Sequence, residues 1–370
     1  MELNKIKQRL ELALKPAKPP TIEEVLEQVS TRGVLRGPVD WVFPAWMLYV
    51  EYTTQRIIET FQLSEEEKRQ LLDFRDTLKR LLLEAWIQAK EKLTTLYKAV
   101  AEGTYRVEGK RLYAPDGTWM YTKVFVPRIL IHGISALARF PDILKLPQEK
   151  LELFQLGWRA SDEGEINGQP DMGTTQPWQV FAWVAARYGE LRAHVTSVNL
   201  TRECVSVSMR IIARSWRQKW SKDEAIDLVA SHLRRGEWAP LLTAWLGDGQ
   251  AERRKVLSSE YKLMIAAKEP WRLGNNIGVR KALVATGREA FVKLKEAAGV
   301  YGVLLDVLKA HKWIYIKLAS DDTLRAAYKL KAEKRSIDVL RETYRRNNVE
   351  TPRSHILRRT NLAPWLWRAS

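Results

Sequence analysis

"LLTAWLGDG", from Leu241 to Gly249, is an apolar, helix-like run that stops on an acid followed by glycine. A second stretch of the same kind, "LGWRASDEG", runs from Leu156 to Gly164. Each stretch carries small residues four positions apart, which places them on one face of a helix. These residues are Gly157 and Ser161 in the earlier stretch and Thr243 and Gly247 in the later one. We therefore expect the two helices to pack against each other very closely.

Both stretches end in a carboxylate, and close packing is expected to bring Glu163 and Asp248 together. Two carboxylates held side by side repel each other, and a shared divalent cation relieves that repulsion. Glu163 and Asp248 are therefore the predicted metal ligands and catalytic acids of a Mg²⁺ site. Because the first stretch ends in Asp-Glu, Asp162 is an alternative ligand. The glycine that follows each acid is expected to end its helix in a left-handed turn.

The composition points to a polyanionic partner. The chain has 370 residues, with 61 Lys and Arg against 44 Asp and Glu, which gives a formal net charge of +17. For a water-soluble chain this charge favours nucleic acid as the partner. The alternative is a Lys- and Arg-rich protein of an organism that lives at high temperature. A single Cys and five His exclude a disulfide framework and multi-cysteine metal sites, so an expected metal is a hard cation held by carboxylates.

The chain shows no signal for membrane insertion. The N-terminal stretch "MELNKIKQRLELALKPAKPP" lacks a sustained apolar core, and no apolar run reaches the ~18 residues that a membrane helix needs. We therefore expect a cytoplasmic protein without a membrane partner. Two acid-ended helices in one chain also predict a monomer.

The hydrophobic periodicity predicts an α+β fold in four parts. A helical N-terminal domain is followed by a β-meander, a core that repeats one order of elements, and a basic helix with a Trp-rich tail. The expected boundaries are 1–102 for the helical domain, 103–146 for the meander and connector, 147–330 for the two-repeat core, and 331–370 for the basic tail.

Strand-like runs follow each acid-ended helix and alternate polar with apolar residues. In one of them Val205, Val207 and Met209 share a face, and Ser206, Ser208 and Arg210 share the other. A second run, "WIYIKLAS" from Trp313 to Ser320, is also predicted to be a strand. The polar faces are the predicted DNA contacts: Arg192, His194, Ser206, Ser208, Arg210, Lys262, Tyr315 and Lys317. Lys262 and Lys317 are further candidates for stabilising charge at a cleaved phosphate.

On these motifs the chain resembles the LAGLIDADG homing endonucleases and their non-cutting relatives. Single-chain members carry two copies of a nine-residue motif, with an acid at position eight and glycine at position nine. Glu163 and Asp248 would then stand at position eight, 248 minus 163 or 85 residues apart, followed by Gly164 and Gly249. Over residues 147–330 the resemblance implies paired motif helices above two saddle-shaped antiparallel sheets that grip double-stranded DNA, with Mg²⁺-dependent cleavage. Arg159, inside a helix that is usually apolar, departs from the pattern.

The stretches "YAPDGTW" and "ARFPDILKLPQEKLELFQLGWRASDEGE" also resemble an archaeal, multicopy repeat family of the PaREP type. That resemblance implies that the LAGLIDADG-like core is degenerate. Three functions therefore stay open at this point: a DNA endonuclease, a catalytically inactive DNA-binding protein of a mobile or multicopy element, and an RNA-binding protein.

Overall fold

The computed structural model describes residues 3–122, 126–250, 262–266, 277–280, 282–286, 288–326 and 329. Met1–Ser320 form one compact unit and Asp321–Ser370 form a second. The first unit mixes helices with antiparallel sheets, so the α+β class is confirmed. Among the described residues, none of the helices combines the length and the apolar character needed to cross a membrane.

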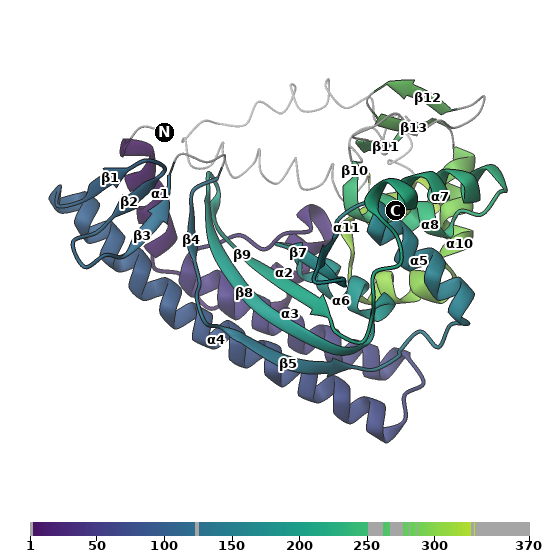
Figure 1. Cartoon of the computed structure of the whole chain (residues 1–370), viewed down its shortest axis with the longest axis horizontal. Helices are drawn as coiled ribbons and strands as arrows, with labels where there is room; N and C mark the ends of the chain where they lie inside the picture. Colours follow the sequence, from purple (N-terminus) through teal and green to yellow (C-terminus); the bar gives the residue numbers. More distant parts are fainter. Residues whose placement is uncertain are drawn as a thin grey trace, which may run out of the picture. The chain divides into compact units, whose positions relative to one another are not determined.

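One large antiparallel sheet lies at the centre of the first unit (Figure 1). Its strand order is β1-β2-β3-β4-β8-β9-β7-β6, and β5 also pairs with β8. The strands are β1 (Arg106–Glu108), β2 (Arg111–Tyr113), β3 (Trp119–Tyr121), β4 (Arg128–Leu130), β5 (Ser135–Phe140), β6 (Glu163–Ile166), β7 (Gln169–Thr174), β8 (Gly189–Thr201) and β9 (Cys204–Ala213). The predicted meander is confirmed as β1 to β3, and it extends the sheet that contains β8 and β9.

The long strands β8 and β9 have one apolar and one polar face, as their alternation predicts. Val205, Val207 and Met209 are each 1 % exposed or less and form part of the core. The opposite face carries the polar residues between them, and Arg210 on that face is exposed. Helices therefore cover one side of this sheet, and the polar side chains stand on the other.

The N-terminal helices pack on the apolar side of the sheet. They are α1 (Leu3–Leu14), α2 (Ile22–Arg32), α3 (Val39–Thr60) and α4 (Glu65–Glu102). As predicted, Ser64 is the N-cap of α4, where the Ser64 hydroxyl and the Glu67 carboxylate form a capping box. Along its 38 residues α4 contacts β3, β4, β5 and β8, so it follows the back of the sheet (Figure 1). The N-terminal helices are thus part of the same compact unit as the sheet.

Within the described residues, the remaining helices are the two acid-ended helices, α5 and α8, and four others. They are α5 (Gln148–Ala160), α6 (Pro177–Ala186), α7 (Lys222–Arg234), α8 (Ala239–Asp248), α10 (Arg288–Val307) and α11 (His311–Ser320). The predicted starts are confirmed at Pro147 for α5, Pro177 for α6 and Ser221 for α7. α10 is interrupted at Gly299, whose φ of 50° is left-handed.

A second antiparallel sheet repeats the order of four strands of the first. It follows α8 and consists of β10 (Gly249–Gln250), β11 (Lys262–Ala266), β12 (Ile277–Arg280) and β13 (Ala282–Thr286). Counted from the preceding acid-ended helix, the strands of both sheets run first, second, fourth, third: β6-β7-β9-β8 after α5 and β10-β11-β13-β12 after α8. In the described residues, four strands thus follow each acid-ended helix in the same order, although the predicted repeat also contained a strand from Trp313 to Ser320.

The prediction of a strand from Trp313 to Ser320 is wrong, because these residues form α11. Trp313, Ile316 and Ala319 lie three apart and are buried, with α10 and α2 packed against the helix. Short apolar runs do not distinguish a strand from a buried helix by period alone. The predicted basic C-terminal helix and tail, 331–370, lie outside the described residues.

Candidate functional site

The two acid-ended helices, α5 and α8, are in close contact at their small residues, as predicted. A methyl group on Gly157 would overlap the carbonyl oxygen of Pro240 and the Thr243 hydroxyl, and would come within 2.8 Å of the Ala244 nitrogen. A methyl group on Gly247 would lie 2.6 Å from Cβ of Ser161. The Thr243 hydroxyl donates to the Phe154 carbonyl at 2.8 Å, which ties the helices together through a buried hydrogen bond. The crossing therefore requires glycine in each helix.

Where these helices end, Asp248 meets Asp162. The pKa of Asp248 is raised to about 6, first by burial and then by the negative charge of Asp162 and a hydrogen bond between the two carboxyl groups. Each of these causes disfavours the charged form of the Asp248 carboxyl group. The alternative acid, Asp162, is thus the partner of Asp248.

Two lysines neutralise this acid pair from equivalent positions. The Lys222 ammonium group, at the start of α7, donates to the Ser161 carbonyl, and the Lys312 ammonium group, at the start of α11, donates to the Gly247 carbonyl. Each carbonyl belongs to the residue just before one of the acids. Burial lowers the pKa of Lys312 to about 8, although Asp162 and Asp248 act in the opposite direction. Both ammonium groups act electrostatically on Asp248, since each lowers its pKa.

A hydrogen-bond chain fixes the orientation of Asp162. The side-chain amide of Gln179, on α6, donates to Oδ2 of Asp162, and the Thr174 hydroxyl donates to Oε1 of Gln179 at 2.5 Å. Gln179 is 1 % exposed, so this amide has little room to rotate. The first acid is therefore held in place by the hairpin and helix that follow it in the chain.

Glu163 does not take the role predicted for it. Its carboxylate is fully buried and accepts two hydrogen bonds from Arg187, at 2.9 and 2.8 Å. The Trp183 indole and the Gln218 amide each donate to it at 2.8 Å. With both oxygens bonded in this way, Glu163 is a structural anion at the start of β6. The motif is thus shifted by one residue, and the acids are separated by 248 minus 162, or 86 residues.

The glycines after the acids also differ from the prediction, since neither ends its helix in a left-handed turn. Gly249 has φ −68° and ψ 147°, which is extended backbone, and it starts β10. A methyl group on Gly249 would come within 2.5 Å of Cγ of Trp245, and one on Gly164 within 2.5 Å of Oδ1 of Asp171. These glycines are required by close contacts rather than by a special φ.

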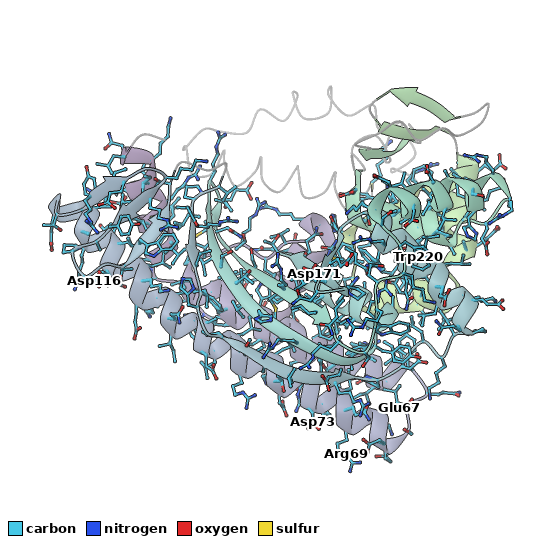
Figure 2. The ribbon with its side chains drawn as sticks, viewed as in Figure 1. Glu67, Arg69, Asp73, Asp116, Asp171 and Trp220 are labelled. Carbon is cyan, nitrogen blue, oxygen red and sulfur yellow. The ribbon has the colours of Figure 1, made fainter. Side chains whose placement is uncertain are left out.

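Arg159, the departure inside the first motif helix, has a structural explanation. Its guanidinium donates to the Trp220 carbonyl at 2.9 Å and pairs with Glu165 at 3.2 Å. Trp220 is labelled in Figure 2, in the segment that leads into α7. Arg159 thus joins α5 to the residues that position Lys222.

Five of the predicted DNA contacts share the polar face of β8 and β9. The strand register places His194 opposite Arg210, and Ser208 and Ser206 pair with Ser197 and Asn199 of the neighbouring strand. The five are Arg192 and His194 on β8 and Ser206, Ser208 and Arg210 on β9. Arg192 and Arg210 are exposed, whereas Ser206 is buried. Burial first, and then these two arginines, lower the pKa of His194.

A polar hollow of about 610 Å³ extends from this face to Asp162. Its wall includes Asp162 and Gln179 on one side, and Arg128 and Arg210 from the sheet. Arg210 pairs with Asp171 of β7, which is labelled in Figure 2, at 3.3 Å. Burial raises the pKa of Asp171 despite this arginine. The hollow therefore brings cationic, amide and carboxylate groups to one surface.

The other predicted contacts lie elsewhere. Lys317 is on α11 and pairs with Asp306, and Tyr315 on the same helix is buried with its ring against His311. Neither side chain belongs to a sheet face, because the segment is a helix. Lys262 is in β11, opposite Thr286, and its side chain lies outside the described part of the structure.

Sequence reasoning missed Lys222, Lys312, Gln179 and Arg128. The two lysines leave a weak signal, since they follow their acids by similar distances: 222 minus 162 is 60, and 312 minus 248 is 64. Gln179 and Arg128 reach the site only through the folding of the hairpin and the meander. No local pattern marks them.

The acid pair offers a hard cation no more than two carboxylates. Within the described ranges there is no group of three or more His, Cys, Asp and Glu side chains placed to hold a metal. Mg²⁺ is commonly bound through one or two carboxylates, with water and substrate phosphates completing its coordination. Asp162 and Asp248 would supply those two carboxylates.

Comparison with protein-family models gives no match, and comparison with curated proteins and with solved structures gives no significant match either.

Proposed function

We propose that the chain binds double-stranded DNA across the polar face of the large sheet. The observation that carries the proposal is the continuity of this face with the hollow that contains Arg128, Arg210 and Asp162. A polar sheet face backed by helices, on a chain with a formal net charge of +17, is suited to a polyanion.

The repeated strand order supports the LAGLIDADG-like interpretation of the fold. α5 and α8 cross at glycines, and each is followed by a sheet with the same order of strands. This arrangement has an internal twofold character, which suits the two strands of a duplex. In this proposal the sheet face contacts phosphates and grooves, and the acid pair lies between the two repeats.

Binding of a labelled 30-bp duplex at several salt concentrations tests the proposal. Replacement of Arg128 or Arg210 by Ala is expected to weaken binding and to lower the slope of log affinity against log salt by about one for each lost phosphate contact. Arg69→Ala is the matched control, since Arg69 pairs with Glu66 on α4, at the back of the sheet (Figure 2). An equal loss in Arg69→Ala would show that the charge of the whole chain, and not this face, binds the DNA.

Mg²⁺-dependent cleavage of the bound DNA is the second candidate function. The meeting of Asp162 and Asp248 at the helix ends favours it, because a divalent cation relieves the repulsion between two carboxyl groups that lie side by side. A bound Mg²⁺ would polarise the phosphate and activate water. Asp162 and Asp248 would hold it, Gln179 would keep Asp162 oriented, and Lys222 and Lys312 would add positive charge near a phosphate.

Cleavage of supercoiled plasmid with and without Mg²⁺ or Mn²⁺ separates the two candidates. The comparison is between wild type and the Asp162→Asn/Asp248→Asn double variant, which keeps the size of both side chains. Metal-dependent nicking that disappears in the variant, with duplex affinity unchanged, would establish the nuclease. If neither protein nicks while both bind the duplex, the chain is a DNA-binding protein whose acid pair serves the helix interface.

A further inference from the structure

Arginine and aromatic side chains alternate across the accessory strands β1 to β4. The Arg106 guanidinium lies 4.9 Å from the centre of the Tyr113 ring, and that of Arg111 lies 4.2 Å from the centre of the Trp119 ring. The guanidinium groups of Arg111 and Arg128 lie 5.5 and 5.3 Å from the centre of the Tyr121 ring. We call these six residues the arginine–aromatic ladder: Arg106, Arg111, Tyr113, Trp119, Tyr121 and Arg128.

The ladder occupies one face of the meander, and apolar residues occupy the other. In each of β2, β3 and β4 the middle residue, Leu112, Met120 or Ile129, has no exposed surface. The residues on either side of it point away from this core. The three arginines of the ladder are exposed and its three rings are partly exposed. Planar groups are therefore presented to solvent on a rigid, helix-backed sheet.

The strand register joins the ladder to the polar face of β8 and β9. Arg111 pairs with Tyr121, Tyr121 with Arg128, and Arg128 with Asn199, which in turn pairs with Ser206. Residues directly opposite in neighbouring strands project from the same face. The ladder thus continues the proposed duplex-binding face at its β4 edge, and Arg128 belongs to both. Figure 1 shows β1 to β3 at the end of the sheet away from α5 and α8, and Figure 2 labels Asp116 in the turn between β2 and β3.

We propose that the arginine–aromatic ladder binds single-stranded DNA by stacking unpaired bases on its rings and guanidinium planes. Exposed aromatic and arginine planes on a sheet are suited to base stacking, and arginine adds contacts to the phosphates. A duplex does not offer these contacts, because its base faces are already stacked on one another. Neighbouring strands are ~4.8 Å apart, so β1 to β4 extend over roughly 14 Å, room for a short run of nucleotides. DNA is the expected strand because the ladder adjoins the proposed duplex face.

This inference goes beyond duplex binding by the sheet and is tested with a different probe. The full-length protein is titrated into labelled (dT)20, and fluorescence anisotropy gives the affinity. Trp119→Ala and Tyr121→Ala are each expected to weaken (dT)20 binding by about 5- to 150-fold, the range that corresponds to loss of one stacking ring. Trp119→Phe should retain most of the affinity, because it keeps a ring at that position. The affinity for the 30-bp duplex should stay within about twofold of wild type for these variants.

Matched controls distinguish a binding role from a structural one. Tyr188→Ala removes a ring that packs on Trp216 at the opposite end of β8, and it should leave (dT)20 binding unchanged. Arg111→Gln alters an exposed side chain, so it tests the ladder if a ring variant loses its fold by circular dichroism. Unchanged (dT)20 affinity in folded Tyr121→Ala and Arg111→Gln would overturn the proposal. An equal loss of duplex and single-strand affinity would make the ladder part of the duplex face, and tighter binding of (rU)20 than of (dT)20 would contradict its assignment to DNA.

Discussion

Asp162 and Glu163 are neighbours in the chain, yet their carboxylates have opposite environments. Glu163 accepts hydrogen bonds from Arg187, Trp183 and Gln218 and is fully buried. Asp162 lies against the Asp248 carboxyl group and lines a polar hollow. A carboxylate whose lone pairs are all used has little chemistry left to perform, whereas two carboxyl groups side by side, only partly compensated by nearby lysines, can accept a proton or a cation. The difference shows that position along a motif is a weaker guide to function than the groups that face each acid.

The largest expected effect follows from breaking the Glu163 ion pair. Glu163→Gln leaves the Arg187 guanidinium, 1 % exposed, without its counter-charge, so the free energy of unfolding should fall by about 3–5 kcal/mol. Urea denaturation measures the loss. Glu165→Gln is the matched control, since its pair with Arg159 is partly solvated and should be worth about 1 kcal/mol or less. A Glu163→Gln protein as stable as wild type would mean that Glu163 is free to act as a ligand.

A somewhat smaller effect is expected from separating the two acid-ended helices. Gly157→Ala inserts a methyl group where the Pro240 carbonyl and the Thr243 hydroxyl already lie, and overpacking of this kind costs about 1–3 kcal/mol. The same variant should lower the pKa of Asp248 toward its ordinary value, because Asp162 moves away. Gly173→Ala is the control, since the nearest atom to its new methyl group is 3.9 Å away. Equal stability of the two variants would show that the crossing is loose.

The helix crossing could be predicted from the sequence because it depends on local spacing. Gly157 with Ser161 and Thr243 with Gly247 lie four apart, and no other information is needed to place each pair on one face. The polar face of β8 and β9 could also be predicted from the sequence, since alternation alone assigns Arg210 and Val207 to opposite sides.

The rest of the site depends on contacts between distant parts of the chain. Arg187, more than twenty residues further along the chain, forms an ion pair with Glu163. This pairing leaves Asp162, and not Glu163, to face Asp248. Lys222 and Lys312 reach the acids because α7 and α11 begin beside the ends of α5 and α8. The prediction for Lys317 failed for a different reason, since an eight-residue apolar run fits a strand and a buried helix alike.

The acid pair should also give a pH-dependent difference in stability. The pKa of Asp248, about 6 in the folded protein, lies above its ordinary value of 3.8. A raised carboxyl pKa stabilises the fold below pH 3.8, and this contribution is lost as the pH rises through 6. Asp248→Asn removes that loss, so relative to wild type it should be more stable at pH 7.5 than at pH 4. The gain should be on the order of 1 kcal/mol after allowance for solvent screening.

Thermal denaturation across pH 4–8 measures this difference. Asp306→Asn provides the control, because Asp306 pairs with Lys317 on a different surface. Relative to wild type, Asp306→Asn should become less stable as the pH rises, because the ion pair that it lacks forms only when the aspartate is charged. If Asp248→Asn showed the same trend as Asp306→Asn, then Asp248 would be an ordinary surface anion, and the acid pair would not differ from Glu163 in the way described above.

The smallest effect is expected at Lys317. Comparing it with Lys312 tests which lysine acts on the acid pair. Lys312 and Lys317 lie on the same helix, but Lys312 is 9 % exposed and donates to the end of α8, whereas Lys317 pairs with Asp306. Lys317→Ala should change the free energy of unfolding by about 0.5 kcal/mol or less and leave duplex affinity within about twofold of wild type. Lys312→Ala should instead raise the pKa of Asp248 further, because it removes a positive charge that lowers it. A titration of Asp248 that responds to both variants alike would place Lys317 at the acid pair, where the sequence pattern alone had put it.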